Sequence, residues 1–476
     1  MVKIKPFKAV VLNPELERET GKGGKGSRAE MVCPVYDTID AALYEKYSAK
    51  KNNVICFTTR KEGVEEWEFV AAAKQNLNRF FRERLLVERE KPAFYIYGVR
   101  YSLSGEVLEQ IPEEDRREIY FALGLVALVK TERLNEGEIF GHEKTFEAKT
   151  RERCRLMKAC DLHFSPIVAA YKMSSHDHEG EGKSEMSRIF ENYLRRDPIV
   201  DVELDGARHL LWEISDTEIV GRIQSLMKGE KIIILDGHHR YAASSRLGTA
   251  AYALTMLLDG RDEGKGLLLL PWHRCVKVGE SRMQDLWSRV EANFGVEKVE
   301  KVESYERSKW CESKWCESKW CESESENENE SENENESEKD ENEFRVRLGM
   351  YDGDNFFLLR VDERKIRALA EERGERVGLD LISLHEWVLG PDSVPDPTVS
   401  EIAFVASPRE AVRKVDAGEC RVAFFLKPLR IAEVEHKARE ERKAFPQKST
   451  LFLPKVAEGV VMCRVLPTPL ISFNHD

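Results

Sequence analysis

The segment Leu235–Gly248, LDGHHRYAASSRLG, decides more about this fold than any other stretch of the chain. Before it, Lys231–Leu235 (KIIIL) is a β-branched run that predicts a buried strand. Asp236-Gly237 predicts a turn, and His238–Leu247 predicts a helix that Gly248 ends. A strand, a turn and a helix N-terminus bring backbone N–H groups and the positive end of a helix dipole together. The pattern therefore predicts an anion-binding turn.

The first helical turn also carries His238, His239 and Arg240. Two imidazoles and a guanidinium beside a helix N-terminus form a good site for a phosphate group. The alternative is that Asp-Gly is an ordinary strand-to-helix turn and that the histidines only cap it. We favour the anion site, because His-His-Arg is an unusual choice for a plain turn.

The length of 476 residues predicts two or three domains. No stretch approaches a membrane span, and the start MVKIKPFKAV lacks an apolar signal region. The ten cysteines are scattered and form no CxxC pair, which is typical of a reducing compartment. We therefore expect a soluble cytoplasmic protein without a membrane partner.

Most of the net charge of −12 comes from one low-complexity segment, 308–343. It repeats KWCES three times and continues as a Ser/Glu/Asn tract with a net charge of −10, which leaves −2 for the rest of the chain. Such a composition predicts a disordered surface insertion, and its cysteine spacing does not match a zinc site. The nearly neutral remainder lacks the basic surplus of a nucleic-acid-binding protein, so we expect no nucleic-acid partner.

Outside the insertion, helical and strand-like patterns alternate, which predicts an α/β (α+β) fold. Residues 67–86 and 115–129 have apolar patterns that we interpret as helices, whereas 93–102 predicts a strand. After the insertion, two strand-like runs are followed by helical and strand-like segments in turn. The Gly-rich segment Gly21–Ser27 lacks the lysine that a phosphate loop needs before its serine, so we interpret it as a mobile basic loop.

A second cluster of reactive residues is Gly141–Thr145, GHEKT, just before a predicted helix over 146–160. Glu143 beside His142 suits a general base that accepts the proton of a substrate hydroxyl. Equally, Glu143 could cap the following helix. The second histidine of a helical zinc-protease motif is missing, so we do not expect that class.

Three further segments place polar groups at strand ends or turns. GARHLLWEI contains His209 and Trp212, and the default interpretation is an ordinary packed strand. LLPWHR ends an apolar run at Arg274. PQKSTLFLP contains a Lys-Ser-Thr cluster, 448–450, which suits contact with a phosphate but is also typical of a solvated turn.

Together, and in this order, these segments resemble the DUF1015 family. The resemblance rests on CPVYDTI near the N-terminus, GHEKT with Arg153, SPI, RHLLW, DGHHRY, LPWHR and QKSTLFLPK, and it spans nearly the whole chain apart from the insertion. The family's central region is similar to the ParB/sulfiredoxin-like fold and to free-serine kinases. The resemblance implies an N-terminal α/β domain over 1–130, a ParB/sulfiredoxin-like catalytic domain over 131–275, and a C-terminal α/β domain over 276–476.

Kinases of this kind phosphorylate free L-serine to O-phosphoserine. A small archaeal branch uses ADP, and longer proteins of this architecture are linked to pyrophosphate. The resemblance therefore implies L-serine and pyrophosphate, or ADP or ATP, as substrates, with Mg²⁺ as cofactor. It implies catalytic roles for His142, Glu143 and Asp236, with Asp236 also on the metal.

Further roles follow from the same resemblance. It assigns phosphate binding to His238, His239, Arg240, Lys448, Ser449 and Thr450, and serine binding to Thr145, His209 and Trp212. Two positions depart from the family pattern: Thr150 replaces a residue that is often basic, with Lys149 just before it, and Val35 replaces a proline. Neither change removes a presumed catalytic group.

Another class remains open. ParB-like domains also bind nucleotides or DNA without catalysis, although this chain shows no helix-turn-helix segment with a basic recognition face. A thiol-repair activity of the sulfiredoxin kind would need a cysteine in the turn where His238 and His239 stand. The sequence leaves the phosphate donor, the exact hydroxylated acceptor and the oligomeric state open.

Overall fold

The computed structural model describes residues 2–16, 28–171, 184–248, 251–299, 347–390 and 402–465, apart from Glu109 and Pro112. The Gly-rich segment Gly21–Ser27 and the low-complexity segment 308–343 lie outside the described residues. What we predict for these two segments therefore stays a prediction.

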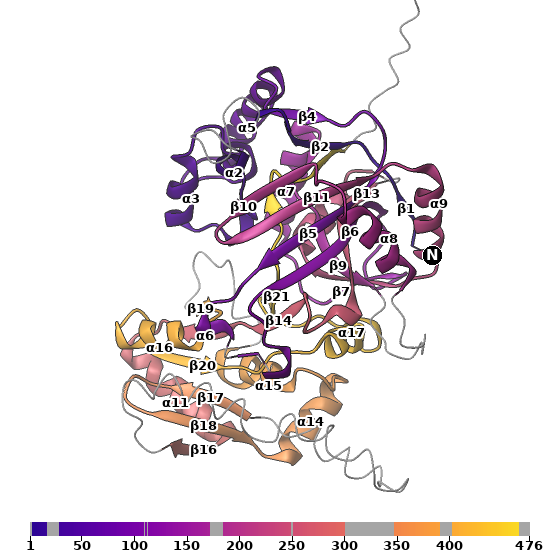
Figure 1. Ribbon diagram of the computed structural model, residues 1–476. Helices are drawn as coiled ribbons and strands as arrows, with labels where there is room; N and C mark the ends of the chain where they lie inside the picture. Colours follow the sequence, from indigo (N-terminus) through magenta and orange to yellow (C-terminus); the bar gives the residue numbers. More distant parts are fainter. Residues whose placement is uncertain are drawn as a thin grey trace, which may run out of the picture.

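Nine strands form the largest sheet (Figure 1). They run in the order β10-β11-β5-β6-β13-β9-β12-β7, with β1 paired to β6. Their bounds are β1 Ile4–Lys5, β5 Phe94–Tyr101, β6 Tyr120–Lys130, β7 Ile139–Gly141, β9 Ile167–Tyr171, β10 Val200–Leu204, β11 Ala207–Ile214, β12 Ile232–Asp236 and β13 Tyr252–Asp259. The pairs β13–β9 and β12–β7 are parallel and the others antiparallel. The expected mixed α/β (α+β) class is confirmed.

Helices cover both faces of this sheet, because alternate residues of its central strands enter two different apolar cores. Tyr95 and Tyr97 belong to one core with α7 and α10, whereas Phe94 and Ile96 belong to the other with α8. The helices of this part are α2 Arg28–Met31, α3 Ala41–Ser48, α4 Ile55–Thr58, α5 Glu66–Arg82, α6 Gly105–Leu108, α7 Glu147–Cys160, α8 Glu185–Leu194, α9 Thr217–Leu226 and α10 His238–Ser245.

One predicted helix is wrong. Residues 115–129 read as helical, but β6 occupies Tyr120–Lys130 and pairs with β5 on one side and β13 on the other. A central strand that is buried on both faces is apolar throughout, so its sequence lacks the alternation that marks a half-buried strand. The tertiary pairing decides the conformation here.

A second, six-stranded sheet lies in the C-terminal half, with all neighbouring strands antiparallel (Figure 1). Its order is β16-β18-β17-β20-β15-β19, and its bounds are β15 His273–Val276, β16 Phe294–Val299, β17 Arg347–Tyr351, β18 Phe356–Val361, β19 Ile402–Val405 and β20 Val422–Phe425. Its helices are α11 Glu280–Asn293, α14 Glu363–Arg373, α15 Leu379–Leu384, α16 Pro408–Asp416 and α17 Ile431–Arg439. The alternation expected after the insertion is confirmed.

The end of the chain returns to the N-terminal half in three short strands. β21 Thr450–Leu453 pairs with β14 Leu268–Pro271, and β22 Ala457–Glu458 pairs with β3 Cys33–Pro34. β23 Met462–Arg464 lies between β2 Ala9–Leu12 and β8 Leu162–His163. β4 Leu86–Glu88 pairs with β2 and completes this four-stranded sheet. Hydrogen bonds therefore cross both domain boundaries drawn from the sequence, and the C-terminal residues come to lie beside the turn at 236–238.

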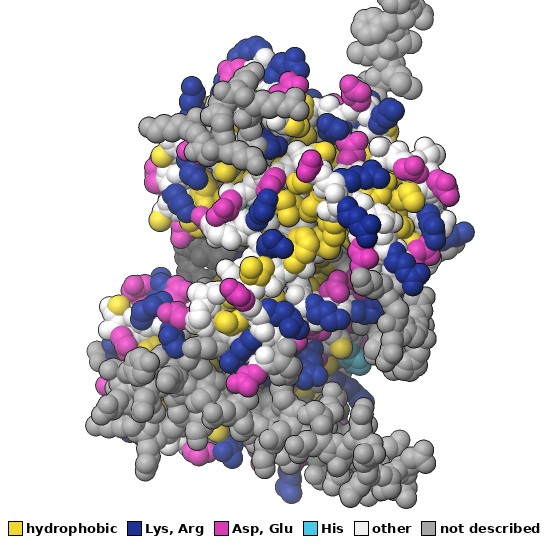
Figure 2. All heavy atoms as spheres, in the orientation of Figure 1, with side chains coloured by type: hydrophobic (Ala, Val, Ile, Leu, Met, Phe, Trp, Pro, Cys, Tyr) yellow, Lys and Arg dark blue, Asp and Glu magenta, His cyan; other side chains and the backbone are white. Residues whose placement is uncertain are grey.

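The surface in Figure 2 carries lysine and arginine interspersed with acidic side chains, around apolar side chains in the middle of the view. Among the described side chains visible on this face, lysine and arginine form no continuous stripe of the kind that follows a nucleic-acid backbone. Among the described residues, no helix combines the length and the apolar character needed to traverse a bilayer.

Candidate active site

The strand, turn and helix predicted around Asp236 are confirmed. β12 ends at Asp236, Gly237 has φ +91°, and α10 begins at His238. A Cβ on Gly237 would lie 2.9 Å from the guanidinium of Arg240, and its φ is unfavourable for other residues. Glycine is therefore required here by both the backbone and its neighbour.

Asp236 is the centre of a buried cluster of charges. Its Oδ1 accepts a hydrogen bond from Lys455 Nζ and its Oδ2 accepts one from Arg240 Nη2, each at 2.8 Å. Burial alone would raise the pKa of Asp236, but Lys455 and Arg240 outweigh it and hold the pKa well below its usual range. The carboxylate is thus ionised, with a cation on each oxygen.

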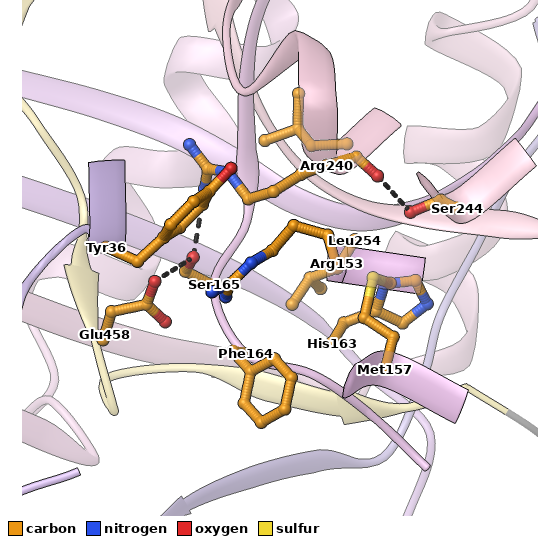
Figure 3. Close-up of a pocket in the computed structure, with 11 residues that line it drawn as sticks. Tyr36, Arg153, Met157, His163, Phe164, Ser165, Arg240, Ser244, Leu254 and Glu458 are labelled. Atoms are coloured by element: carbon orange, nitrogen blue, oxygen red, sulfur yellow. Dashed lines mark hydrogen bonds between the residues drawn. The ribbon is translucent and has the colours of Figure 1, made fainter. Parts of the chain in front are cut away.

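Both terminal nitrogens of Arg240 are hydrogen-bonded to protein groups, whereas its buried Nε has no partner among the described residues. Besides Asp236, it donates to Ser165 Oγ at 3.0 Å and to the carbonyl of Pro166. It borders a cavity of about 20 Å³ (Figure 3), which Tyr36, Arg153 and Glu458 also line. That volume is enough for about one water. Arg240 therefore fixes Asp236, and the phosphate contact predicted for it would require it to leave these partners.

Three histidines surround the turn and are neutral. Burial lowers the pKa of His142 and of His239 to about 4 and that of His238 well below its ordinary value. His238 Nε2 accepts the N–H of His142 at 3.3 Å, and His239 Nε2 accepts the N–H of Phe146 at 2.9 Å. Desolvation disfavours the imidazolium, so in this arrangement His238 and His239 add no positive charge, and their predicted contact with a phosphate stays a prediction.

His142 connects the turn to the C-terminal segment. Its Nδ1 lies 2.9 Å from the carbonyl oxygen of Ile234, which can only accept, so Nδ1 carries the proton. Its Nε2 then accepts from Thr450 Oγ1 at 3.0 Å. His142 and Thr450 therefore join β12 to β21 within the core, and neither presents a free ring nitrogen or hydroxyl to a substrate in this arrangement.

Glu143 follows β7 and faces the Lys-Ser-Thr segment. The neighbouring backbone is fixed because the Phe445 N–H donates to the His142 carbonyl at 2.8 Å. Glu143 Oε1 accepts from both the N–H and the Oγ of Ser449, each at 3.3 Å. The residue as a whole is half-buried. The structure thus gives Glu143 a partner far along the chain, and it caps no helix, since Phe146 is the N-cap of α7 and makes no side-chain cap.

The charges around Glu143 tune its proton affinity. Burial raises the pKa of its carboxyl, and Asp236 raises it further, whereas Lys448 and Lys455 lower it. A carboxylate whose proton affinity is raised is a stronger base than an exposed one, provided that it stays ionised at the working pH. Together with Arg240, the two lysines outnumber the carboxylates of Asp236 and Glu143, so the site can attract an anionic ligand.

The residues predicted to bind serine do not form one pocket. His209 hydrogen-bonds to Tyr97 Oη at 3.0 Å, whereas Trp212 Nε1 donates to the carbonyl of Arg196 at 2.9 Å. Their register on β11 places them on opposite faces of the sheet. A shared pocket of His209 and Trp212 is therefore wrong, and both are buried core residues with partners of their own. Thr145 is exposed two residues after Glu143.

Sequence reasoning missed the residues that hold the site together. Lys455, Arg274, Ser165 and Glu458 all contact or border the site residues. Lys455 and Arg274 stand in segments that the sequence singled out, but a single lysine or arginine at a strand end carries no signal of its partner. Only the return of the C-terminal strands brings Lys455 to Asp236.

Comparisons with known proteins identify the family. Residues 4–381 match the model of "Protein of unknown function (DUF1015)", which ends before the Lys-Ser-Thr segment. No curated protein matches the chain. Solved structures with some likeness include a "Free serine kinase in complex with AMP" (14% identity, 68% of this chain and 89% of that chain, TM-score 0.32). Others are a "Conserved hypothetical protein from Pyrococcus furiosus" (15%, 66% and 87%, TM-score 0.30) and "SbnI with C-terminal truncation from Staphylococcus aureus" (12%, 71% and 88%, TM-score 0.33). The match over most of its length shows that this chain belongs to the DUF1015 family.

Proposed function

We propose that this protein is a small-molecule kinase that phosphorylates free L-serine to O-phospho-L-serine, with pyrophosphate as the donor. One observation carries the proposal. The carboxylate of the half-buried Glu143, with a raised pKa, lies at the strand-turn-helix segment beside Lys448 and Lys455. A base beside fixed cations is what transfer of a phosphoryl group to a hydroxyl requires. The likeness to the solved kinases is too distant to add an argument.

In this proposal Glu143 accepts the proton of the serine hydroxyl as its oxygen attacks the nearer phosphorus of pyrophosphate. The bond from that phosphorus to the bridging oxygen breaks, and inorganic phosphate leaves with the bonding electron pair. Lys448 and Lys455, whose charges act on Glu143 and Asp236, would neutralise charge on the donor oxygens. Ser449 holds the carboxylate of Glu143 in place through Oε1.

The donor set is compatible with Mg²⁺ that arrives on the phosphate. Within the described residues, no group of three or more His, Cys, Asp or Glu side chains forms a cage for a metal ion. Mg²⁺ commonly keeps its waters and binds through one or two carboxylates plus phosphate oxygens, and the ionised carboxylate of Asp236 fits that demand. An ion held by Asp236 would neutralise charge on the phosphate oxygens.

The testing experiment is phosphoserine formation, followed by mass spectrometry, from L-serine and Mg²⁺ with pyrophosphate, ADP or ATP supplied separately. Product with pyrophosphate alone supports the whole proposal. Product with a nucleotide instead replaces the donor and keeps the kinase. Absence of product with every donor contradicts the proposal, and the same samples with homoserine and threonine then test another hydroxylated acceptor.

A further inference from the structure

Arg274 is completely buried in β15, yet it makes no ion pair with a carboxylate in the part of the chain that the structure describes. Its guanidinium donates instead to backbone carbonyls: Nη1 to Lys448 at 2.9 Å and to Trp272, and Nη2 to Gln447 at 3.3 Å. Its Nε donates to His385 Nε2 at 3.4 Å. The carboxylates of Glu143 and Asp380 favour its charge without forming an ion pair with it. A buried cation without a direct ion pair is costly, which suggests that Arg274 has a specific role.

The carbonyls that Arg274 binds belong to the turn before β21. Lys448 has φ +53°, a left-handed conformation that residues with a side chain adopt at an energetic cost. The next residue, Ser449, donates both of its hydrogen bonds to Glu143. A strained turn that presents two polar residues to a carboxylate needs an external hold, and Arg274 is the side chain that binds both of its carbonyls.

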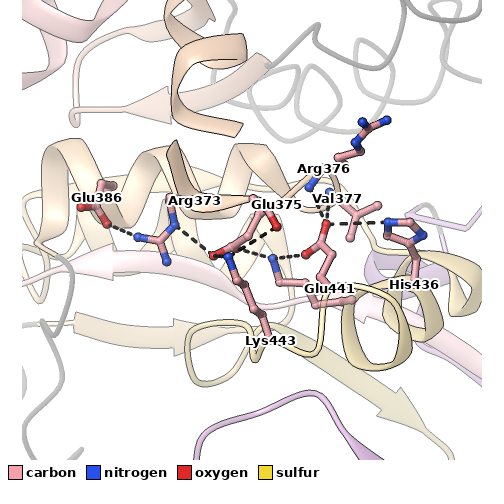
Figure 4. Close-up of polar contacts among 10 residues, drawn as sticks. Arg373, Glu375, Arg376, Val377, Glu386, His436, Glu441 and Lys443 are labelled. Atoms are coloured by element: carbon pink, nitrogen blue, oxygen red, sulfur yellow. Dashed lines mark hydrogen bonds and ion pairs between the residues drawn. The ribbon is translucent and has the colours of Figure 1, made fainter. Parts of the chain in front are cut away.

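The same segment is fixed at its beginning by a second buried cation. Lys437 on α17 is fully buried and pairs with Glu375 and with Glu441, the latter at 2.8 Å, in the network of Figure 4. Lys437 also lies 5.0 Å from the centre of the Phe445 ring. The chain between these anchors crosses from the C-terminal half to Glu143. Lys437 has its carboxylate partners within its own half, whereas Arg274 binds the turn itself.

We propose that Arg274 is a positioning residue of the transfer site, which holds the Gln447–Lys448 turn so that Lys448 and Ser449 face Glu143. The inference rests on the proposed function for its kinetic consequences, but not for the turn it describes. A planar guanidinium binds two carbonyls at once, and a lysine in its place keeps the charge but offers a single point of contact. The contact of the planar guanidinium with two carbonyls, more than its charge, therefore holds the turn.

The test compares Arg274→Lys and Arg274→Met with His273→Gln. His273 is the matched control, because it is buried one position earlier on β15 and contacts Gln110 and the N–H of Leu426 rather than the turn. Hydrogen exchange over 445–453 reports the turn without any reaction. We expect Arg274→Met to lose amide protection at 448–450 and Arg274→Lys to lose part of it, while His273→Gln keeps wild-type protection there.

Kinetics give the second measurement. We expect Arg274→Met to lower kcat by about 10²-fold, the effect of displacing a catalytic group by about 1 Å, with an unchanged KM for serine. We expect the kcat of Arg274→Lys to lie between those of the wild type and Arg274→Met. In a further variant, Arg274→Ala, added methylguanidinium should partly restore kcat. Wild-type protection and kcat in Arg274→Met would overturn the inference, and so would an equal loss in His273→Gln.

The two proposals fail separately. If wild-type protein makes no phosphoserine but Arg274→Met still exposes 448–450, the kinase assignment fails and the hold on the turn stands. If Arg274→Met unfolds, Arg274→Lys and its hydrogen exchange decide the question. An active wild type with unaltered exchange in that lysine variant refutes the positioning role alone.

Discussion

Replacing Glu143 by glutamine tests the centre of the proposed chemistry. Glutamine has the same shape and keeps a side-chain oxygen for the N–H and Oγ of Ser449, which lie 3.3 Å from the present Oε1. What it loses is the negative charge and with it the ability to accept a proton. The variant therefore separates the role of Glu143 as a base from its role in holding Ser449.

The expected magnitudes differ strongly for folding and for turnover. Loss of a general base lowers turnover by about 10²–10⁴-fold. This corresponds to about 2.7–5.4 kcal/mol in the activation barrier. The free energy of unfolding should change by less than about 1 kcal/mol, because glutamine keeps an oxygen for the two long hydrogen bonds and removes the cost of burying a charge. A large kinetic loss with little loss of stability is the expected signature.

The assay is phosphoserine formation under saturating serine and donor, with thermal unfolding measured on the same samples. Glu147→Gln is the control, because Glu147 is exposed four residues later and pairs with Arg246 at the surface. We expect this control to keep wild-type turnover. A folded Glu143→Gln variant with full activity would refute the assignment of the base, since no other described carboxylate contacts Ser449.

Three further predictions follow from the charges of the site. Burial raises the pKa of Glu143 and outweighs the opposing effect of Lys448, Lys455 and Arg274, so kcat/KM should fall on acidification at a pH above that expected of an ordinary glutamate. Lys455→Met removes one of these cations and should move this fall in kcat/KM to still higher pH. An unchanged pH profile in Lys455→Met would assign the fall to another group. Asp236→Asn should lower the free energy of unfolding near pH 7 by about 3–5 kcal/mol, because it leaves two cations without their partner. That contribution is present above the unfolded pKa of aspartate and disappears as pH falls through the depressed folded pKa. The free energies of unfolding of the wild type and Asp236→Asn, measured by chemical denaturation, should therefore converge at acidic pH. A difference that does not change with pH would contradict the argument. Chelation should abolish turnover and Mg²⁺ restore it, while calorimetry with Mg²⁺ alone should show no tight binding; tight binding without pyrophosphate would reveal a metal cage that the described residues do not suggest.

Local patterns predicted the elements around the site well. KIIIL, Asp-Gly and the helix after it have strong local signals, and the structure confirms all three. Residues 115–129 were misread because a strand that is buried on both faces has no polar face to reveal its period. Short strands such as β21 to β23 contain no local signal of their distant partners.

The site shows the same division. The sequence alone determined that Glu143 stands just before a helix and that a strand, a turn with Asp236 and a second helix follow one another, because backbone propensity and glycine geometry act locally. It could not show that burial keeps His238 neutral, and it placed His209 with Trp212, although strand alternation separates them. Only the tertiary structure brought Lys455 to Asp236 and Ser449 to Glu143, across more than two hundred residues of chain. Charge and proton affinity at this site are properties of neighbours in space, and these are set by the packing of the C-terminal strands against the large sheet.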